Sequence, residues 1–143
     1  LHAAPAGHGG QGDRQVTRDL VIVACAISAG IHAALTPEHF RESTAAGVGF
    51  LAATVTLAAV AAALTRRPGS ALLLGVAAAS LAGLLGSYAL AVTIGLPLLH
   101  PEPEPVTGLA LFTKGVEAVG LFAAASSLAA FSLPLPRLKG TLT

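Results

Sequence analysis

A lysine and a glutamate interrupt one of the long apolar runs of this chain. Lys114 and Glu117 are three residues apart, so on a helix both side chains would lie on one face. Counted from Val106 at about 1.5 Å per residue, Glu117 would lie roughly 16 Å along that helix, near the middle of a hydrocarbon core of about 30 Å. Ionisable groups at this depth face a protein interior or a water-filled cavity. Three interpretations stay open: a self-neutralising ion pair, a proton or ligand site, or a contact with a polar group on another subunit.

A second polar stripe lies on another apolar run. Cys25, Ser28 and His32 follow one another at helical spacing and would share a face. Cys25 fits a packing residue, because a free cysteine behaves as a small hydrophobe. His32 would either hydrogen-bond to nearby backbone or to Glu117, or carry a proton or a ligand. Lys114, Glu117 and His32 together form the predicted intramembrane polar site, and no residue is predicted to be catalytic.

Histidines and glutamates near two bends of the chain are candidate metal ligands. Imidazole and carboxylate groups suit zinc, copper(II) or iron. The candidate set is His32, His39, His100, Glu38 and Glu102. No local spacing is diagnostic, and the stretch HAALTPEH differs from the HExxH zinc motif. Copper or zinc is therefore a cofactor hypothesis that requires the two bends to meet in space.

The elements that must position these residues are strongly apolar. The chain has 143 residues, 54% of them hydrophobic and 10% charged, with a mean hydropathy of +0.76. A soluble domain carries about a quarter charged residues, so the natural solvent of this chain is lipid. A net charge of +1 excludes the basic footprint of a nucleic-acid-binding protein. A single cysteine excludes an internal disulfide, and no hydrolase, nucleotide-binding or haem-attachment motif supports enzyme activity.

Four apolar runs predict membrane-spanning helices, since about 20 residues cross the hydrocarbon core. The predicted spans are residues 20–35, 45–64, 71–99 and 106–131, within a transmembrane domain of residues 16–133. Strand alternation is missing, and short connections force neighbouring helices to be antiparallel. The predicted fold is an all-α, antiparallel bundle of four transmembrane helices. Residues 1–15 and 134–143 would be flexible tails.

Basic residues are distributed unevenly over the predicted loops and tails. Arg14, Arg18, Arg66, Arg67, Arg137 and Lys139 fall on one side, whereas Arg41 lies on the other beside Glu38, Glu42, Glu102 and Glu104. Cytoplasmic loops carry an excess of lysine and arginine. Both termini are therefore predicted to be cytoplasmic, and two acidic bends would face outward.

The two outward bends resemble each other. GIHAALTPEHF (30–40) and GLPLLHPEPEP (95–105) each contain a glycine, an apolar step, a histidine and a Pro-Glu pair. This favours a duplicated helical hairpin with both copies in the same orientation. Pro37 is predicted to start the first turn, and Pro97 to kink or end the third helix, because proline lacks a backbone donor and restricts the preceding residue.

The third apolar run carries a small residue at every fourth position. This small-residue ridge consists of Gly75, Ala79, Gly83, Ser87, Ala91 and Gly95. Small residues let helix backbones approach closely and promote helix association in lipid. The ridge could pack within the bundle or against another subunit. Narrow side chains also leave little internal volume, which argues against a broad solute channel within one copy.

The sequence around the two bends resembles that of other proteins. Its most specific positions are His32, Pro37, Glu38, His39, Gly95, Pro97 and Glu104 to Val106. Over roughly half of its length, the chain resembles a loose group of small four-helix integral membrane proteins from high-GC bacteria. The resemblance implies a four-helix layout in a bacterial inner membrane and an important role for the bends, and it brings no established activity. Lys114 departs from the group's pattern, so the ion pair would be particular to this chain.

The first functional hypothesis from these observations is a non-enzymatic membrane protein that serves as an accessory or assembly subunit of a larger complex. The ridge, the small size and the near absence of interfacial aromatics favour a position set by partner helices. One alternative is a small oligomeric proton-linked transporter that uses Glu117, Lys114 and His32. Another is an outward-facing copper- or zinc-binding protein. The expected partners are the lipid bilayer and other membrane subunits or further copies, and no nucleic acid.

Overall fold

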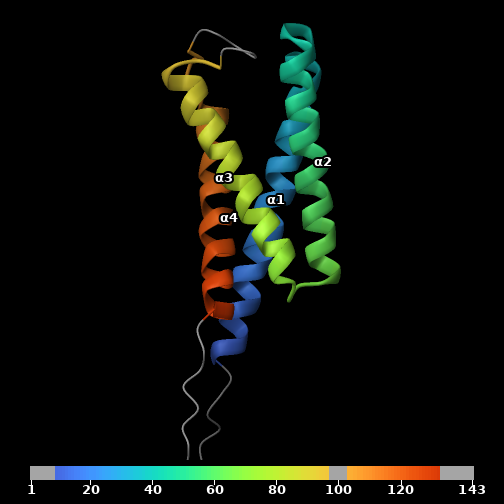
Figure 1. Ribbon diagram of the computed structural model, residues 1–143, viewed down its shortest axis with the longest axis vertical. Helices are drawn as coiled ribbons and strands as arrows, with labels where there is room; N and C mark the ends of the chain where they lie inside the picture. Colours follow the sequence, from blue (N-terminus) through green and yellow to red (C-terminus); the bar gives the residue numbers. More distant parts are fainter. Residues whose placement is uncertain (1–8, 97–102, 133–143) are drawn as a thin grey trace, which may run out of the picture.

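Four long α-helices make up the computed structural model, which describes residues 9–96 and 103–132 (Figure 1). The helices are α1 (Gly9–Glu42), α2 (Thr44–Arg66), α3 (Ala71–Thr93) and α4 (Gly108–Ser132). Each is long and apolar enough to cross a membrane. The predicted all-α fold with four spans is therefore confirmed, and the chain is a multi-pass integral membrane protein. The side of the membrane that each end occupies stays a prediction.

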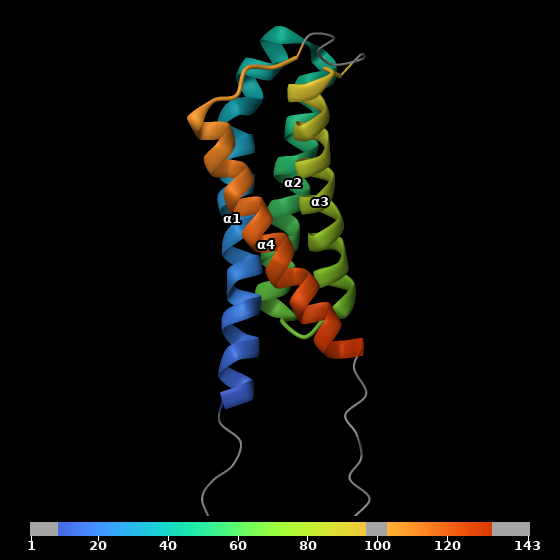
Figure 2. The same cartoon turned by 90° about the vertical axis from the view of Figure 1, so that its left-hand side faces the viewer.

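The helices form two antiparallel hairpins, α1 with α2 and α3 with α4 (Figures 1 and 2). α1 packs most extensively on α2 and next on α4, and α4 packs in turn on α3. α2 and α3 touch each other much less. Figure 1 shows them close together near the turn that joins them and farther apart toward the opposite end. The main contact between the two hairpins is therefore the one that α1 makes with α4.

α1 is the longest element and begins earlier than predicted. Residues 9–15 are already helical, so the predicted N-terminal tail is shorter than expected. This segment contains Arg14 and Gln15, which are good helix formers, and the hydroxyl of Thr17 donates to the carbonyl of Asp13 at 2.7 Å. At 34 residues α1 is about 51 Å long, more than the roughly 30 Å of a hydrocarbon core. At least one end of α1 must therefore extend beyond the lipid interior.

α1 also continues through the turn that was predicted at Pro37. The helix runs on to Glu42, and Ser43 alone separates it from α2. Proline is tolerated in membrane helices. Pro37 leaves the Ala33 carbonyl without its helical donor, and beside it Thr36 donates its hydroxyl to the His32 carbonyl at 2.7 Å. Ser43 ends the connection as an N-cap, since its hydroxyl accepts from the backbone N–H of Ala46 at 3.0 Å.

A close approach of two helices makes this short connection feasible. The Phe40 ring of α1 lies on Gly47 of α2, and a Cβ at position 47 would overlap with that ring. Gly47 is buried, whereas Gly49 has no atom within 4 Å of where its Cβ would be. One glycine therefore seats the last turn of α1 directly on the first turn of α2.

α3 ends at Thr93, earlier than the predicted residue 99. Gly95 follows with a φ of 72°, a left-handed conformation that glycine adopts readily. The backbone N–H of Glu104 donates to the carbonyl of Ala91 at 3.0 Å, which ties the segment before α4 to the end of α3. Pro97, His100, Glu102, Arg137 and Lys139 lie outside the described residues.

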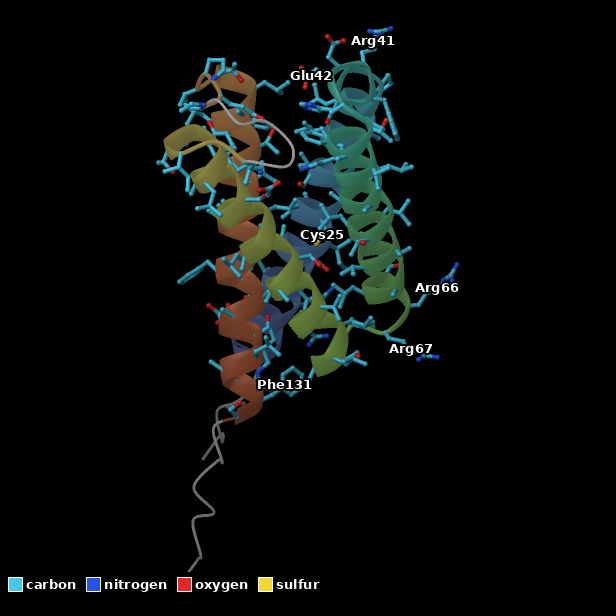
Figure 3. The ribbon with its side chains drawn as sticks, turned by 45° about the horizontal axis from the view of Figure 1, so that its top comes forward. Cys25, Arg41, Glu42, Arg66, Arg67 and Phe131 are labelled. Atoms are coloured by element: carbon cyan, nitrogen blue, oxygen red, sulfur yellow. The ribbon has the colours of Figure 1, made fainter. Side chains whose placement is uncertain are left out.

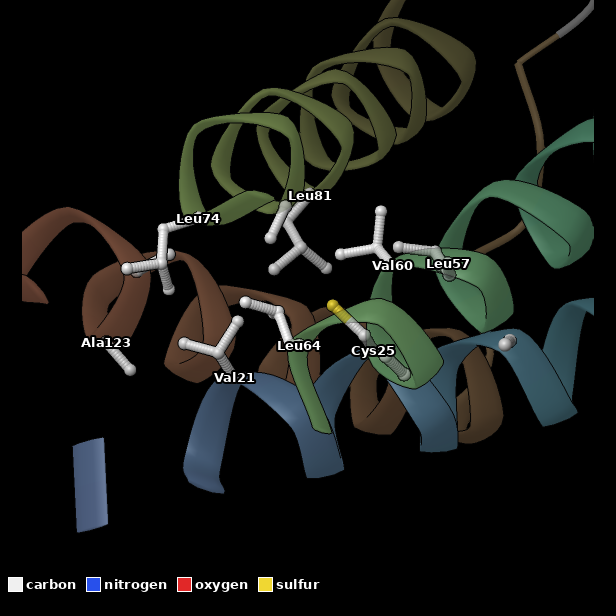
Figure 4. Close-up of a cluster of buried hydrophobic side chains, with 12 residues drawn as sticks. Val21, Cys25, Leu57, Val60, Leu64, Leu74, Leu81 and Ala123 are labelled. Carbon is white, nitrogen blue, oxygen red and sulfur yellow. The ribbon is translucent and has the colours of Figure 1, made fainter. Parts of the chain in front are cut away.

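An apolar core occupies the half of the bundle nearer the α2–α3 turn (Figure 4). Its members are Val21, Cys25, Ala29, Leu57, Val60, Ala61, Leu64, Leu74, Ala77, Leu81, Ala123 and Ala124. Cys25 is free and buried among them, so its predicted packing role is confirmed. The helices approach closely beside this core at Gly120, where a Cβ would lie 2.6 Å from the Ala24 side chain and 3.0 Å from Leu81 Cδ1. Glycine at this position lets α1, α3 and α4 meet.

Charged side chains mark the two ends of the bundle. Figure 3 shows Arg66 and Arg67 at one end and Arg41 and Glu42 at the other. We call the first the arginine-rich end; its described basic residues are Arg14, Arg18, Arg66 and Arg67. The start of α1 and the finish of α4 lie at this end (Figure 1). The described basic residues therefore have the uneven distribution expected from the sequence.

Candidate functional site

Glu117 lies on the face of α4 that meets α1, and it is fully buried. Its Oε1 accepts a hydrogen bond from the Ser28 hydroxyl at 2.7 Å, and its Oε2 accepts one from Lys114 Nζ at 2.6 Å. Each carboxylate oxygen thus has a donor, and a cation lies beside the carboxylate. Buried charges are tolerated where they are paired and hydrogen-bonded in this way. The Ser28 bond spans 89 residues of sequence and links the two hairpins directly.

Lys114 points into the protein rather than out toward the lipid surface. Its side chain is 16% exposed. Besides Glu117, its ammonium group meets the backbone carbonyl of Leu84 at 3.5 Å and lies 5.4 Å from the ring centroid of Tyr88. A cation over an aromatic face is attracted by the ring quadrupole. α3 therefore completes the surroundings of the ion pair, while the Tyr88 hydroxyl is buried without a hydrogen-bond partner among the described residues.

His32 joins the same cluster through Ser28. Its Nδ1 donates to the Ser28 backbone carbonyl at 2.8 Å and lies 3.4 Å from the Ser28 hydroxyl oxygen. Because a carbonyl can only accept, Nδ1 carries the proton. His32 is 6% exposed, and Cys25 and Ser28 are fully buried, so the predicted stripe does face the interior. We call Ser28, His32, Lys114 and Glu117 the polar network.

Phe50 of α2 lies against both histidines of the first bend. Its ring centroid is 5.1 Å from that of His32 and 3.6 Å from that of His39. His39 Nδ1 lies 2.8 Å from a carboxylate oxygen of Glu42. The aromatic ring thus contacts both imidazoles, and each imidazole has a hydrogen-bond partner within its own helix.

The predicted metal ligands do not gather in the described residues. Glu38 pairs with Arg41 at 2.9 Å on an exposed surface. Within 9–96 and 103–132, no three ligand-type side chains are close enough to hold a metal ion. His100 and Glu102 fall outside these ranges. The copper or zinc hypothesis therefore gains no support from the described geometry.

The small-residue ridge of α3 faces away from the other helices. Ala79, Gly83 and Ser87 are exposed, and a Cβ at Gly75 or Gly83 would meet no atom within 4 Å. Ala91 is buried at the far end of the ridge, and Gly95 lies beyond the end of α3. Most of the ridge is therefore free of contacts with the described part of this chain.

Several neighbours of the polar network carry no signal in the sequence. Leu84 contributes only a carbonyl group, and Tyr88 and Phe50 are ordinary members of apolar runs. The spacing of Cys25, Ser28 and His32 predicted that Ser28 faces the interior. It did not predict that Ser28 would bond to Glu117. No family model, curated protein or solved structure matches the chain.

Proposed function

We propose that this membrane protein is a small proton-linked carrier in which Glu117 takes up and releases a proton. The main support is the hydrogen-bonded set of Ser28, Glu117 and Lys114, buried where the two hairpins meet. Ionisable side chains within membrane segments are rare and commonly belong to proton relays or ion pathways. A purely structural contact has little need of them, because well-packed apolar groups often replace a buried ion pair without loss of stability.

Protonation of Glu117 would alter the seam between the hairpins. The added proton turns the carboxylate into a neutral acid and removes its charge attraction to Lys114. The ammonium then has no anionic partner, and it keeps its contacts with the Leu84 carbonyl and the Tyr88 ring. The carboxylate is also the acceptor for the Ser28 hydroxyl of α1, and this bond is charge-assisted only while Glu117 is ionised. The strength of the α1–α4 contact therefore depends on the proton. His32, bonded to Ser28, is the next titratable group of α1 toward the end that carries Arg41.

Flux measurements in liposomes test this function. The purified chain should dissipate an imposed pH gradient faster than empty liposomes do. Glu117→Gln, which retains the shape of the side chain but cannot exchange the proton, should reduce the rate to that of empty liposomes. Thr113→Val is the matched control, because Thr113 is also buried on α4 but donates only to the Leu109 carbonyl of its own helix. Absence of flux in the parent chain, or unchanged flux in Glu117→Gln, would exclude the function.

A second function, association as an accessory subunit, is favoured by the outward ridge of α3. Helix pairing in lipid relies on close packing at small residues, and Ala79, Gly83 and Ser87 of the ridge are exposed within the described chain. A helix from another subunit could approach the α3 backbone closely there. An oligomeric carrier would use the same surface between copies, so identifying the occupant separates the two functions.

Cysteine cross-linking in native membranes identifies that occupant. In a Cys25→Ala background, Gly83→Cys presents a thiol on the ridge and Val55→Cys presents one on the exposed face of α2. A dimer-sized product from Gly83→Cys alone would indicate further copies, and a product with a different protein would indicate an accessory role. If neither variant cross-links, or both do so equally, the ridge faces lipid and the accessory function loses its support.

A further inference from the structure

A cavity of about 680 Å³ opens at the arginine-rich end, far from the polar network. Arg14, Arg18, Asp19 and Ile22 line it from α1, and Leu64 and Thr65 line it from the last turns of α2. The cavity thus lies beside the turn where α2 leaves the membrane. Because Arg14 and Arg18 line the same cavity as Thr65, the arginine-bearing turns of α1 lie level with the end of α2.

The cavity combines a basic wall with an apolar one. Arg14 and Arg18 are one helical turn apart and therefore lie on the same side of α1. Neither forms an ion pair with a carboxylate in the described ranges. Ile22, which is partly exposed, supplies hydrocarbon beside them, whereas Leu64 is 1% exposed and belongs to the apolar core. The Asp19 carboxylate also lines the cavity, so the charge there is one positive unit in excess rather than two.

This arrangement matches the chemistry of a lipid at the membrane surface. A guanidinium group binds phosphate through paired N–H donors. Basic pockets between membrane helices bind anionic headgroups, and an adjacent apolar wall suits the start of the acyl chains. A free phosphate ion would use only the arginines and would make no contact with the apolar surface that Ile22 adds to the cavity. We propose that the cavity binds the headgroup phosphate of an anionic phospholipid, with the start of its acyl chains beside Ile22.

Lipid binding to the purified chain tests the proposal. A fluorescent short-chain phosphatidylglycerol is titrated with protein in a nonionic detergent, and binding is followed by anisotropy. Arg14→Gln with Arg18→Gln should weaken binding by about tenfold, since each basic residue near an anionic lipid contributes several-fold. Arg66→Gln with Arg67→Gln removes the same charge at the same end but not from the cavity, and it should change binding by less than about threefold. Helix content from circular dichroism confirms that each variant is folded.

Competition identifies the ligand. Unlabelled phosphatidylglycerol should displace the probe, whereas phosphatidylcholine and inorganic phosphate should not do so at equal concentration. Equal weakening by the two arginine pairs would overturn the site in favour of a general basic surface. Displacement by phosphatidylcholine would show that headgroup charge is not recognised, and displacement by inorganic phosphate would show a free-anion site. Both outcomes contradict the proposal.

Discussion

The two hairpins meet mainly along the contact of α1 with α4, and this seam has an apolar layer and a polar layer. The apolar layer, nearer the arginine-rich end, brings Ala24, Leu81 and Gly120 into direct contact. The polar layer follows on the same helices, where Ser28 of α1 meets Glu117 of α4. Only one helical turn of α1 separates Ala24 from Ser28. Two kinds of contact therefore hold the same pair of helices over a short distance.

The two layers differ in how they stabilise the helix contact, because in lipid the hydrophobic effect no longer contributes. An apolar side chain gains no hydrophobic free energy by leaving lipid for protein, since both are apolar. The apolar layer must therefore act through shape, and its most demanding contact is at Gly120. The polar layer acts through directed bonds between groups that have no partner in lipid. A change of shape should thus affect the first layer, and the loss of one charge should affect the second.

The largest effect is expected from removing one charge of the polar layer. Lys114→Met takes away the cation but leaves Glu117 buried with Ser28 as its only donor. Removing one partner of a buried ion pair costs about 3 kcal/mol or more, because the other charge stays uncompensated. The free energy of unfolding, measured by titrating mixed detergent micelles with a denaturing detergent, should fall by about that amount.

The double variant Lys114→Met with Glu117→Gln sharpens this result. It removes both charges and retains a side chain that Ser28 can still bond. Its stability should exceed that of Lys114→Met alone, although it carries one more substitution. A double variant that loses the sum of two independent effects would show that the two residues do not act as a pair.

Adding a methyl group to the apolar layer should produce the second-largest effect. Gly120→Ala places a Cβ against Ala24 and Leu81, so α1 or α3 must shift away from α4. Gly115→Ala on the same helix is the control, since a Cβ there meets no atom within 4 Å. Both variants gain about the same helix propensity. The free energies of unfolding of the two variants should therefore differ by about 2 kcal/mol, which is the cost of overpacking alone.

A smaller loss is expected when the apolar layer loses volume. Leu81 is fully buried, so Leu81→Ala leaves a cavity. In soluble proteins such a change costs about 2–5 kcal/mol, of which part is the transfer of hydrocarbon to water. That part is absent in lipid, which leaves the lost packing contacts. We expect a decrease of about 1.5 kcal/mol in the free energy of unfolding. A loss at the top of the soluble range would mean that the apolar layer does not act through shape alone.

The same seam shows how far the sequence can predict this structure. Hydropathy identified four spans because each run is long and nearly free of charge. The spacing of Cys25, Ser28 and His32 correctly identified the buried face of α1. The spacing of Lys114 and Glu117 placed both on one side of α4, and they do form a bonded pair.

Other features depend on contacts that local spacing does not specify. The continuation of α1 past Pro37 involves support within the helix and the seating of Phe40 on Gly47, and a proline followed by charged residues is also typical of a turn. The choice of Ser28 as donor to Glu117 depends on how two faces align across 89 residues. The direction of the α3 ridge likewise depends on which other helices are near, because small residues permit close packing without requiring it.

The smallest effect should come from the hydrogen bond that joins the two hairpins. Ser28→Ala removes the donor to Glu117 Oε1 but leaves the ion pair with Lys114 intact. Hydrogen bonds between membrane helices contribute about 0.6 kcal/mol on average, so the free energy of unfolding should fall by roughly 0.5–1 kcal/mol. Thr113→Val is the matched control with no expected loss, because its hydroxyl bonds only within α4. A Ser28→Ala loss as large as that of Lys114→Met would mean that the serine, rather than the ion pair, holds the polar layer together.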